Sequence, residues 1–181
     1  MKLKKFRFKK VSSTNNTAIR IIKNSNYKFG MVTADTQSNG KGQHGKKWIS
    51  FKGNIFVSFF YELKNINKSL SALTKINCLL VKKILEKYYK NKIIFKKPND
   101  LLIDKKKICG ILQEIISISG NKFLIVGIGI NLIKSPNIKN YPTTNLFELI
   151  NERINKIKFD NELKVIFEKN LTRMYKINNK V

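Results

Sequence analysis

The segment from Gly40 to Gly45, Gly-Lys-Gly-Gln-His-Gly, combines glycine and lysine in a way that suits phosphate binding. Glycines let backbone N–H groups approach an anion closely, and lysine ammonium groups add positive charge. The spacing matches G-x-G-x-x-G, the pattern of dinucleotide-binding and kinase loops. The flanks fit neither class, because residues 36–39 are polar, Trp48 to Phe51 favour extended structure over helix, and no His-Arg-Asp or Asp-Phe-Gly triplet follows. The segment is therefore either a mobile surface loop or an anion-binding loop of another type.

The composition of the chain predicts one globular domain spanning residues 1–181. Its hydrophobic content is 42%, which is sufficient for a substantial core. No apolar run approaches the length that crosses a bilayer, and the basic start, Met1 to Lys10, is not followed by the apolar stretch of a signal peptide. We therefore expect a cytoplasmic protein that does not associate with membranes.

Cysteine and histidine are too scarce for a zinc site. The two cysteines, Cys78 and Cys109, lie far apart in the sequence, and His44 is the single histidine. We expect both cysteines to be small buried core residues and His44 to be exposed in its polar loop. No metal site made by protein ligands is predicted.

The net charge of +26 first suggests a partner that is a nucleic acid. However, lysines occur in every segment and only four residues are arginine, while asparagine and isoleucine are abundant. Compositional drift toward Lys, Asn and Ile explains this distribution. We interpret most of the charge as a solvated surface, which could still speed the encounter with an acidic partner.

Hydrophobic periodicity and turn residues predict three helices and six strands. We expect helices at about 15–23 after the N-cap hydroxyls of residues 12–14, at 69–89 with Ser69 as a possible cap, and at about 161–175. We expect strands at 29–34, 54–63, 93–96, 101–104, 107–117 and 122–132, the last two joined as a hairpin through residues 119–121. This order predicts an α+β fold, with a mixed, largely antiparallel sheet, helices mainly on one face and a ligand slot at the other.

The last predicted strand has two unequal faces. Leu124, Val126, Ile128 and Ile130 form one apolar face, whereas the other carries Phe123, Ile125, Gly127, Gly129 and Asn131. Glycines at alternate positions weaken a strand and mark places where a ligand or another backbone approaches closely. A ligand site and close backbone packing are both compatible with this face, and Gly110 of the partner strand could widen it.

Several sequence blocks together resemble the biotin protein ligases. Residues 96–101, Lys-Lys-Pro-Asn-Asp-Leu, and 106–112, Lys-Lys-Ile-Cys-Gly-Ile-Leu, are similar to that family's Lys-Trp-Pro-Asn-Asp and Lys-Leu-Ala-Gly-Ile-Leu blocks, at the expected separation. Residues 33–37 and 40–48 resemble its biotin-binding loop, 127–131 its closing strand, and 13–15 its first substrate-contacting segment. The blocks cover about residues 12–147 in the expected order.

The resemblance implies the catalytic fold of biotin and lipoate ligases, which is similar to that of class II aminoacyl-tRNA synthetases. It also implies a two-step reaction: the biotin carboxylate attacks the α-phosphate of ATP to give biotinyl adenylate, and a lysine of the biotin carboxyl carrier protein of acetyl-CoA carboxylase then takes the biotinyl group. ATP and Mg²⁺ are the implied co-substrate and ion, and biotin is the substrate.

The resemblance assigns roles to specific positions. Lys107, Lys41 and Asp100 would act at the reacting groups, with Asp100 helping to position magnesium or the incoming amine. The implied biotin-binding residues are Ser13, Thr14, Asn15, Gln37, Gly40, Lys41, Trp48, Gly110, Leu112, Gly127 and Gly129. The implied nucleotide-binding residues are Gly42, Gln43, Lys46, Trp48, Asn99, Lys107 and Asn131. Trp48 could equally be an ordinary core residue, and Ser13 and Thr14 could serve as helix caps.

The chain also departs from the family pattern. Lys41, Gln43 and Lys46 stand where arginines are usual, and lysine lacks the planar fork that arginine offers to phosphate. We expect looser retention of the adenylate at Gln43, and altered packing where Lys97 replaces tryptophan. We also expect no N-terminal helix-turn-helix domain, hence no DNA regulation by that route, and no small C-terminal β-barrel; a monomer and a homodimer are both compatible.

Two other functions remain open from sequence. Lipoate or octanoate attachment is a close alternative, because those enzymes share the fold, although residues 98–100 and the polar set of residues 13–15 with Gln37 favour biotin. A basic nucleic-acid-binding module is the non-enzymatic alternative and is motivated by charge alone.

Overall fold

The computed structural model describes residues 1–64, 66 and 68–178. The strands are β1 (Lys4–Val11), β2 (Phe29–Gln37), β3 (Ile55–Glu62), β4 (Ile94–Lys96), β5 (Asp100–Ile103), β6 (Lys106–Ile118) and β7 (Asn121–Ile130). The helices are α1 (Thr14–Lys23), α2 (Leu70–Leu85), α3 (Leu146–Ile150) and α4 (Lys156–Asn178), with a short 3₁₀ turn at Gln43–Gly45.

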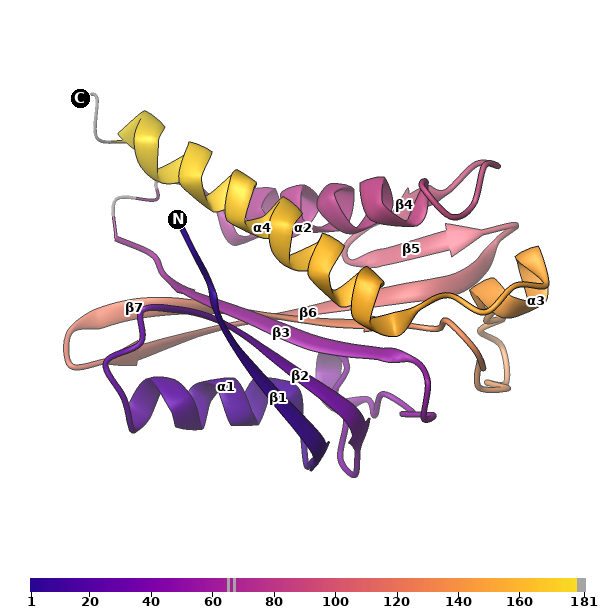
Figure 1. The fold of residues 1–181 in the computed structure, drawn as a ribbon, viewed down its shortest axis with the longest axis horizontal. Helices are drawn as coiled ribbons and strands as arrows, with labels where there is room; N and C mark the ends of the chain where they lie inside the picture. Colours follow the sequence, from indigo (N-terminus) through magenta and orange to yellow (C-terminus); the bar gives the residue numbers. More distant parts are fainter. Residues whose placement is uncertain (65, 67, 179–181) are drawn as a thin grey trace.

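The strands form one mixed sheet in the order β1-β2-β3-β7-β6-β5-β4 (Figure 1). Only β1 and β2 are parallel; the other neighbouring pairs are antiparallel. The β6–β7 hairpin turns at Ser119 and Gly120, which both have positive φ, as a tight two-residue hairpin requires. The predicted α+β sheet and hairpin are therefore confirmed.

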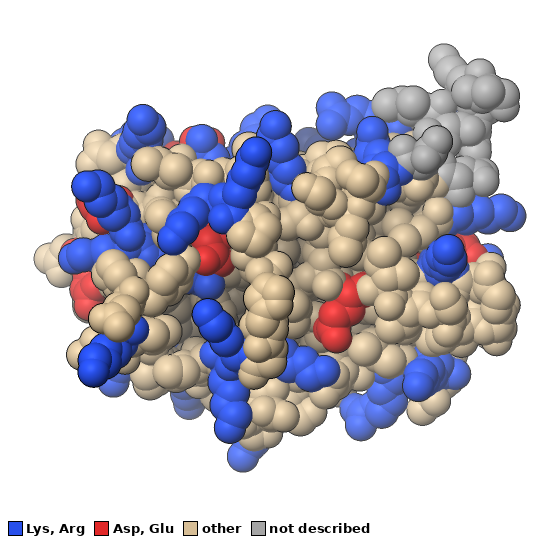
Figure 2. Space-filling view, turned by 180° about the vertical axis from the view of Figure 1, so that it is seen from behind, with Lys and Arg blue, Asp and Glu red and all other residues tan. Residues whose placement is uncertain are grey.

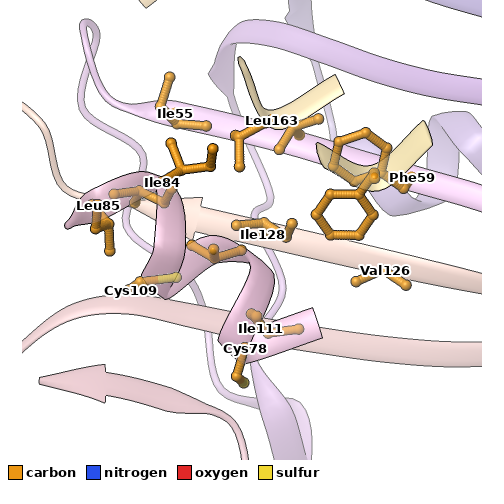
Figure 3. Close-up of a cluster of buried hydrophobic side chains, with 14 of the residues drawn as sticks. Ile55, Phe59, Cys78, Ile84, Leu85, Cys109, Ile111, Val126, Ile128 and Leu163 are labelled. Atoms are coloured by element: carbon orange, nitrogen blue, oxygen red, sulfur yellow. The ribbon is translucent and has the colours of Figure 1, made fainter. Parts of the chain in front are cut away.

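Helices α2 and α4 cover one face of the sheet, and α1 lies on the opposite face (Figure 1). In the main core, side chains of β3, β6 and β7 point toward those of α2 and α4 (Figure 3). The phenyl rings of Phe59 and Phe167 stack with centroids 3.9 Å apart, which joins β3 to α4. Cys78 and Cys109 are fully buried free thiols in this core, as predicted.

A second, smaller core lies under α1. Ala18 and Ile22 of the helix pack on Val32, Phe60, Phe123 and Ile125 of the sheet. The face of β7 that carries the glycines is therefore covered by the α1 core residues at the Phe123 end, and toward Gly127 and Gly129 it has no side chains of its own. The slot thus lies on the α1 face, beyond the start of that helix, and the two larger helices lie on the other.

Two elements of the structure were not predicted, and helix α2 ends earlier and helix α4 begins earlier than expected. The N-terminal segment expected only as a basic start forms β1, because Phe6 and Phe8 pack against the α1 core while its lysines remain outside. Helix α3 was not predicted because it is only five residues long. Ser69 caps α2 by accepting from the Ala72 N–H, as expected, whereas Ser13 occupies the N-cap position of α1 without a side-chain cap bond.

The basic side chains are distributed widely. On the face shown in Figure 2, blue lysine and arginine side chains are spread between uncharged residues, with few acidic ones. Within the described residues, no helix is long and apolar enough to cross a membrane.

Candidate active site

A cavity of about 420 Å³ opens on the α1 face of the sheet. Its floor comes from the antiparallel pair β6 and β7, where Gly110 lies opposite Gly129 and Leu112 opposite Gly127. Its walls come from the start of α1, the end of β2, the loop at 41–49, the turn between β4 and β5, and the segment that follows β7.

The floor glycines leave room for two specific side chains. A Cβ on Gly129 would lie 2.5 Å from Cζ2 of Trp48, and one on Gly110 would lie 2.9 Å from Cζ3 of the same indole. A Cβ on Gly127 would lie 2.9 Å from Cγ of Asn15. Because real Cβ atoms do not approach this closely, glycine is needed for the indole and the Asn15 amide to reach the sheet.

Trp48 therefore lies in the cavity wall and belongs to neither core cluster. The residue is partly buried, and its indole N–H is enclosed without a hydrogen-bond partner among the described residues. A buried donor of this kind is costly unless something accepts from it. This placement favours the role of Trp48 as a cover over the floor.

One end of the cavity holds a continuous polar network. Gln37 Oε1 accepts from the Thr14 N–H at 2.8 Å and lies 3.1 Å from the Thr14 hydroxyl. The hydroxyl of Ser58 lies 2.8 Å from that of Thr14 and 2.5 Å from Oδ1 of Asn15, whose amide nitrogen donates to Glu114 at 2.6 Å. Since Thr14, Asn15 and Ser58 are all buried, this network fixes which way each amide points.

Another part of the cavity is built around Lys107. Its ammonium lies 2.8 Å from Oδ1 of Asp100, and the Tyr141 hydroxyl donates to the other oxygen of the same carboxylate. The side chains of Lys107 and Asp100 are only 19% and 13% exposed, so this ion pair is shielded from bulk water. Two residues predicted to act at the reacting groups are thus brought into direct contact.

The glycine loop forms a small closed turn. Lys41 and Lys47 make an antiparallel bridge, the Gly42 N–H donates to the Lys46 carbonyl at 2.7 Å, and the Trp48 N–H donates to the Gly40 carbonyl at 2.9 Å. The amide of Gly42 is therefore already used inside the loop. Gly40 alone among the predicted site residues does not line the cavity: a Cβ there would lie 2.5 Å from the Trp48 carbonyl oxygen, so this glycine permits the close turn behind it.

Lys41 extends from this turn toward the polar network. Its ammonium donates to Oδ1 of Asn16 at 2.7 Å and lies 3.9 Å from Glu114. His44 is exposed, as predicted, although it also lines the mouth of the cavity.

Two predicted nucleotide-binding amides also have structural partners. The side chain of Asn99 donates to the Ile111 carbonyl at 2.6 Å, which ties the β4–β5 turn to β6. The side chain of Asn131 donates to the Thr144 carbonyl at 3.1 Å, which holds the segment after β7. Both residues line the cavity, so the structure shows their scaffold role and leaves the nucleotide role as a prediction.

Comparison with known proteins places this geometry in a family. Residues 7–131, more than half of the chain, match the Biotin/lipoate A/B protein ligase family. The chain belongs to this family.

Individual relatives within the biotin/lipoate ligase family cover different shares of the chain. The bifunctional ligase/repressor BirA of Bacillus subtilis is 29% identical over 167 residues, which are 88% of this chain and 51% of that protein. BirA of Escherichia coli is 32% identical over 101 residues, 55% of this chain and 32% of that protein. The chain thus spans about half or less of these curated relatives.

Solved structures agree with the family assignment. A biotin protein ligase from Aquifex aeolicus, in complex with biotin and ATP, has a TM-score of 0.79 and 29% identity, covering 94% of this chain and 71% of that one. An archaeal lipoate protein ligase from Thermoplasma acidophilum has a TM-score of 0.66 at 11% identity, covering 95% of this chain and 84% of that one, a likeness of fold alone.

Three residues around the ligase-family cavity were missed from sequence: Ser58, Glu114 and Tyr141. Ser58 could have been noticed as the one small polar residue inside an aromatic strand. Glu114 and Tyr141 carry no local signal, because their importance comes from contacts with residues far away in the sequence.

Proposed function

We propose that this protein is an ATP-dependent biotin protein ligase. The observation that carries the proposal is that the polar network at Thr14, Asn15 and Gln37 and the Lys107–Asp100 pair line the same glycine-floored cavity. Such a cavity can hold a ligand with a polar ring at one position and an anionic group at another. Biotin, with its ureido ring and its carboxylate, has this chemistry.

The proposed first step joins two anions. The biotin carboxylate oxygen attacks the α-phosphorus of ATP, the bond to the β-phosphate oxygen breaks, and pyrophosphate leaves. Lys41, Lys46 and Lys107 line the cavity and would offset the repulsion between carboxylate and phosphate. Partial burial strengthens this attraction at Lys107 most, because its ammonium is the most enclosed of the three.

The proposed second step transfers the acyl group. The amine of a carrier-protein lysine attacks the acyl carbon of the biotinyl adenylate, and AMP leaves. Neither step needs a side-chain nucleophile. Trp48 and the glycine loop would cover the adenylate and limit its hydrolysis by water.

Mg²⁺ would enter with ATP. The described residues contain no cluster of three or more His, Cys, Asp and Glu side chains that could hold a metal ion, so few protein ligands are available. Asp100 is the carboxylate among the cavity-lining residues and would be its protein contact. Bound Mg²⁺ would neutralise charge on the phosphates.

The polar network favours biotin over an acyl chain alone. A lipoyl or octanoyl chain would leave the buried groups of Thr14, Asn15 and Gln37 without partners from the ligand, which lowers affinity. We therefore also propose a biotin carboxyl carrier protein as the partner in the second step.

Pyrophosphate exchange into ATP tests the first step. We expect exchange with biotin and little with lipoate or octanoate under the same conditions. Exchange with only the acyl-chain substrates would assign the protein to the lipoate branch of the family. Tight, salt-sensitive RNA or DNA binding without exchange would instead support a nucleic-acid-binding module.

A further inference from the structure

Tyr141 lies in the segment after β7 and is placed beside Lys107 by backbone bonds. The Lys107 N–H donates to the Pro142 carbonyl at 2.8 Å, and the Thr144 N–H donates to the Lys107 carbonyl at 3.0 Å. These bonds join residues next to Tyr141 to the start of β6. The position of the Tyr141 side chain relative to Lys107 is therefore set by the scaffold.

The Tyr141 side chain has two contacts with the ion pair. Its hydroxyl donates to Oδ2 of Asp100, while Lys107 pairs with Oδ1 of the same carboxylate. Its ring lies 5.5 Å from the Lys107 ammonium, which also lies 5.4 Å from the Trp48 ring. The ammonium is thus held by a carboxylate and two aromatic rings, and Tyr141 touches both the carboxylate and the cation.

We propose that Tyr141 is a positioning residue of the active site, which fixes the Asp100 carboxylate and, through it, the Lys107 ammonium. This inference rests on the proposed function for its catalytic meaning, but the placement of the ammonium is a property of the protein alone. Without the hydroxyl, Asp100 loses its second anchor and can rotate away from Lys107. The ammonium then samples positions that do not match the reacting anions.

The hydroxyl keeps its proton over the working pH range. Burial, then the hydrogen bond and the charge of Asp100, raise the pKa of Tyr141 far above its ordinary value. Tyr141 is therefore a permanent donor to the carboxylate, as an anchor must be.

The chain supplies a matched control. Tyr88 also donates its hydroxyl to a carboxylate, that of Glu162, at 3.1 Å, and it lies outside the cavity. Tyr141→Phe and Tyr88→Phe therefore make the same chemical change at two places. A third variant, Tyr141→Leu, also removes the ring.

Two measurements on these variants test the inference. The first is the kcat and KM for biotin-dependent pyrophosphate exchange, where Tyr141→Phe should lower kcat about tenfold or more, as expected for the loss of a charge-assisted hydrogen bond, with little change in KM for biotin. The second is amine labelling of Lys107 followed by mass spectrometry, with the exposed Lys105 and Lys106 as internal references. Labelling of Lys107 should increase several-fold in Tyr141→Phe.

A double-mutant cycle shows whether Tyr141 acts through Asp100. In an Asp100→Ala background, Tyr141→Phe should have little further effect on labelling or exchange, because its target is gone. Tyr88→Phe should leave both measurements at the wild-type level. Additive effects in the cycle would contradict the proposal.

The outcomes for this residue and for the proposed function are separable. Unchanged Lys107 labelling and unchanged kcat in Tyr141→Phe would overturn the positioning role. If the wild-type protein shows no exchange with biotin, the proposed function fails, while increased Lys107 labelling in Tyr141→Phe would still support the positioning role. Thermal unfolding of all variants verifies that each is folded.

Discussion

Gly129→Ala directly tests whether the glycine face of β7 holds the Trp48 indole. The added Cβ would lie 2.5 Å from Cζ2 and 2.8 Å from Nε1 of Trp48. Carbon atoms pack at about 3.5–4.0 Å, so the ring must move by about 1 Å or leave the floor. The strand backbone cannot yield instead, because β7 is paired on both sides by β3 and β6.

The expected loss of stability follows from overpacking of the site at Gly129. Inserting one methyl group into a filled site usually costs about 1–3 kcal/mol. For a chain of this size that corresponds to a fall in Tm of about 2–4 °C for each kcal/mol. Because the loop that carries Trp48 is largely exposed, the indole can swing outward, and the lower half of this range is expected.

Two assays follow the change. Urea or thermal unfolding measures the stability difference, and intrinsic fluorescence reports the indole itself, since Trp48 is the single tryptophan. We expect red-shifted emission and weaker biotin binding by calorimetry. In the Gly129→Ala, Trp48→Ala double variant, the stability loss from Gly129→Ala should largely disappear.

Unchanged emission and unchanged stability in Gly129→Ala would refute the geometry. A stability loss that persists after removal of the indole would show that Gly129 is needed for the conformation of β7 and not to make room for Trp48.

Three further predictions concern other parts of the molecule. Lys107→Ala should reduce biotin-dependent pyrophosphate exchange about 10²-fold or more, whereas Lys106→Ala, which removes an exposed neighbour, should leave it near the wild-type rate; equal rates for the two variants would contradict the assignment. Gln43→Arg should slow release of the adenylate, because arginine adds a positive charge and a forked hydrogen-bond donor. Release is measured by filtration as the loss of adenylate from the purified complex, and an unchanged rate would show that the side chain at position 43 does not help to retain the adenylate. Cys78 and Cys109 should resist thiol reagents in the native protein, since burial raises the pKa of Cys78 from 9.0 to about 12 and that of Cys109 well above its usual value. Rapid labelling of either thiol at pH 8 without denaturant would contradict this buried placement. The same pKa shifts predict that these thiols do not affect the free energy of unfolding below about pH 9, and that the free energy of unfolding falls above about pH 9, because the thiols ionise first in the unfolded chain.

Local patterns predicted most of the elements because their faces are strongly patterned. Alternation on 122–132 identified both the buried face of β7 and the glycine face of the cavity. Strand β1 was not predicted because Phe6 and Phe8 are its only large apolar residues and they stand among basic ones. Its formation also depends on pairing with β2, whose residues lie about 26 positions away in the sequence. Helix α3 escaped because five residues cannot show a helical period.

The candidate site was predictable as a set of blocks, but its internal connections were not. All of the predicted site residues except Gly40 line one cavity, yet the sequence blocks did not indicate that Lys107 and Asp100 form an ion pair. Nor did they indicate that Gly40 permits the close turn behind the Trp48 carbonyl. Motifs record which residue types recur at a spacing, whereas pairing depends on how distant strands meet.

Tyr141 shows why such connections need a structure. Its hydroxyl donates to the carboxylate of Asp100, which lies 41 positions earlier in the chain. Its position is set by backbone hydrogen bonds between its neighbouring residues and Lys107, which lies 34 positions before Tyr141. No periodicity links positions at these separations, and an isolated aromatic residue in a loop between two prolines has many possible roles. The sheet brings Asp100, Lys107 and Tyr141 together, because β5 and β6 are adjacent and the segment after β7 runs beside them. If a variant of this segment moved Tyr141 without altering β5 or β6, Lys107 should lose its placement while the polar network around Thr14 stays intact, because the two parts of the cavity share no hydrogen bond among the described residues.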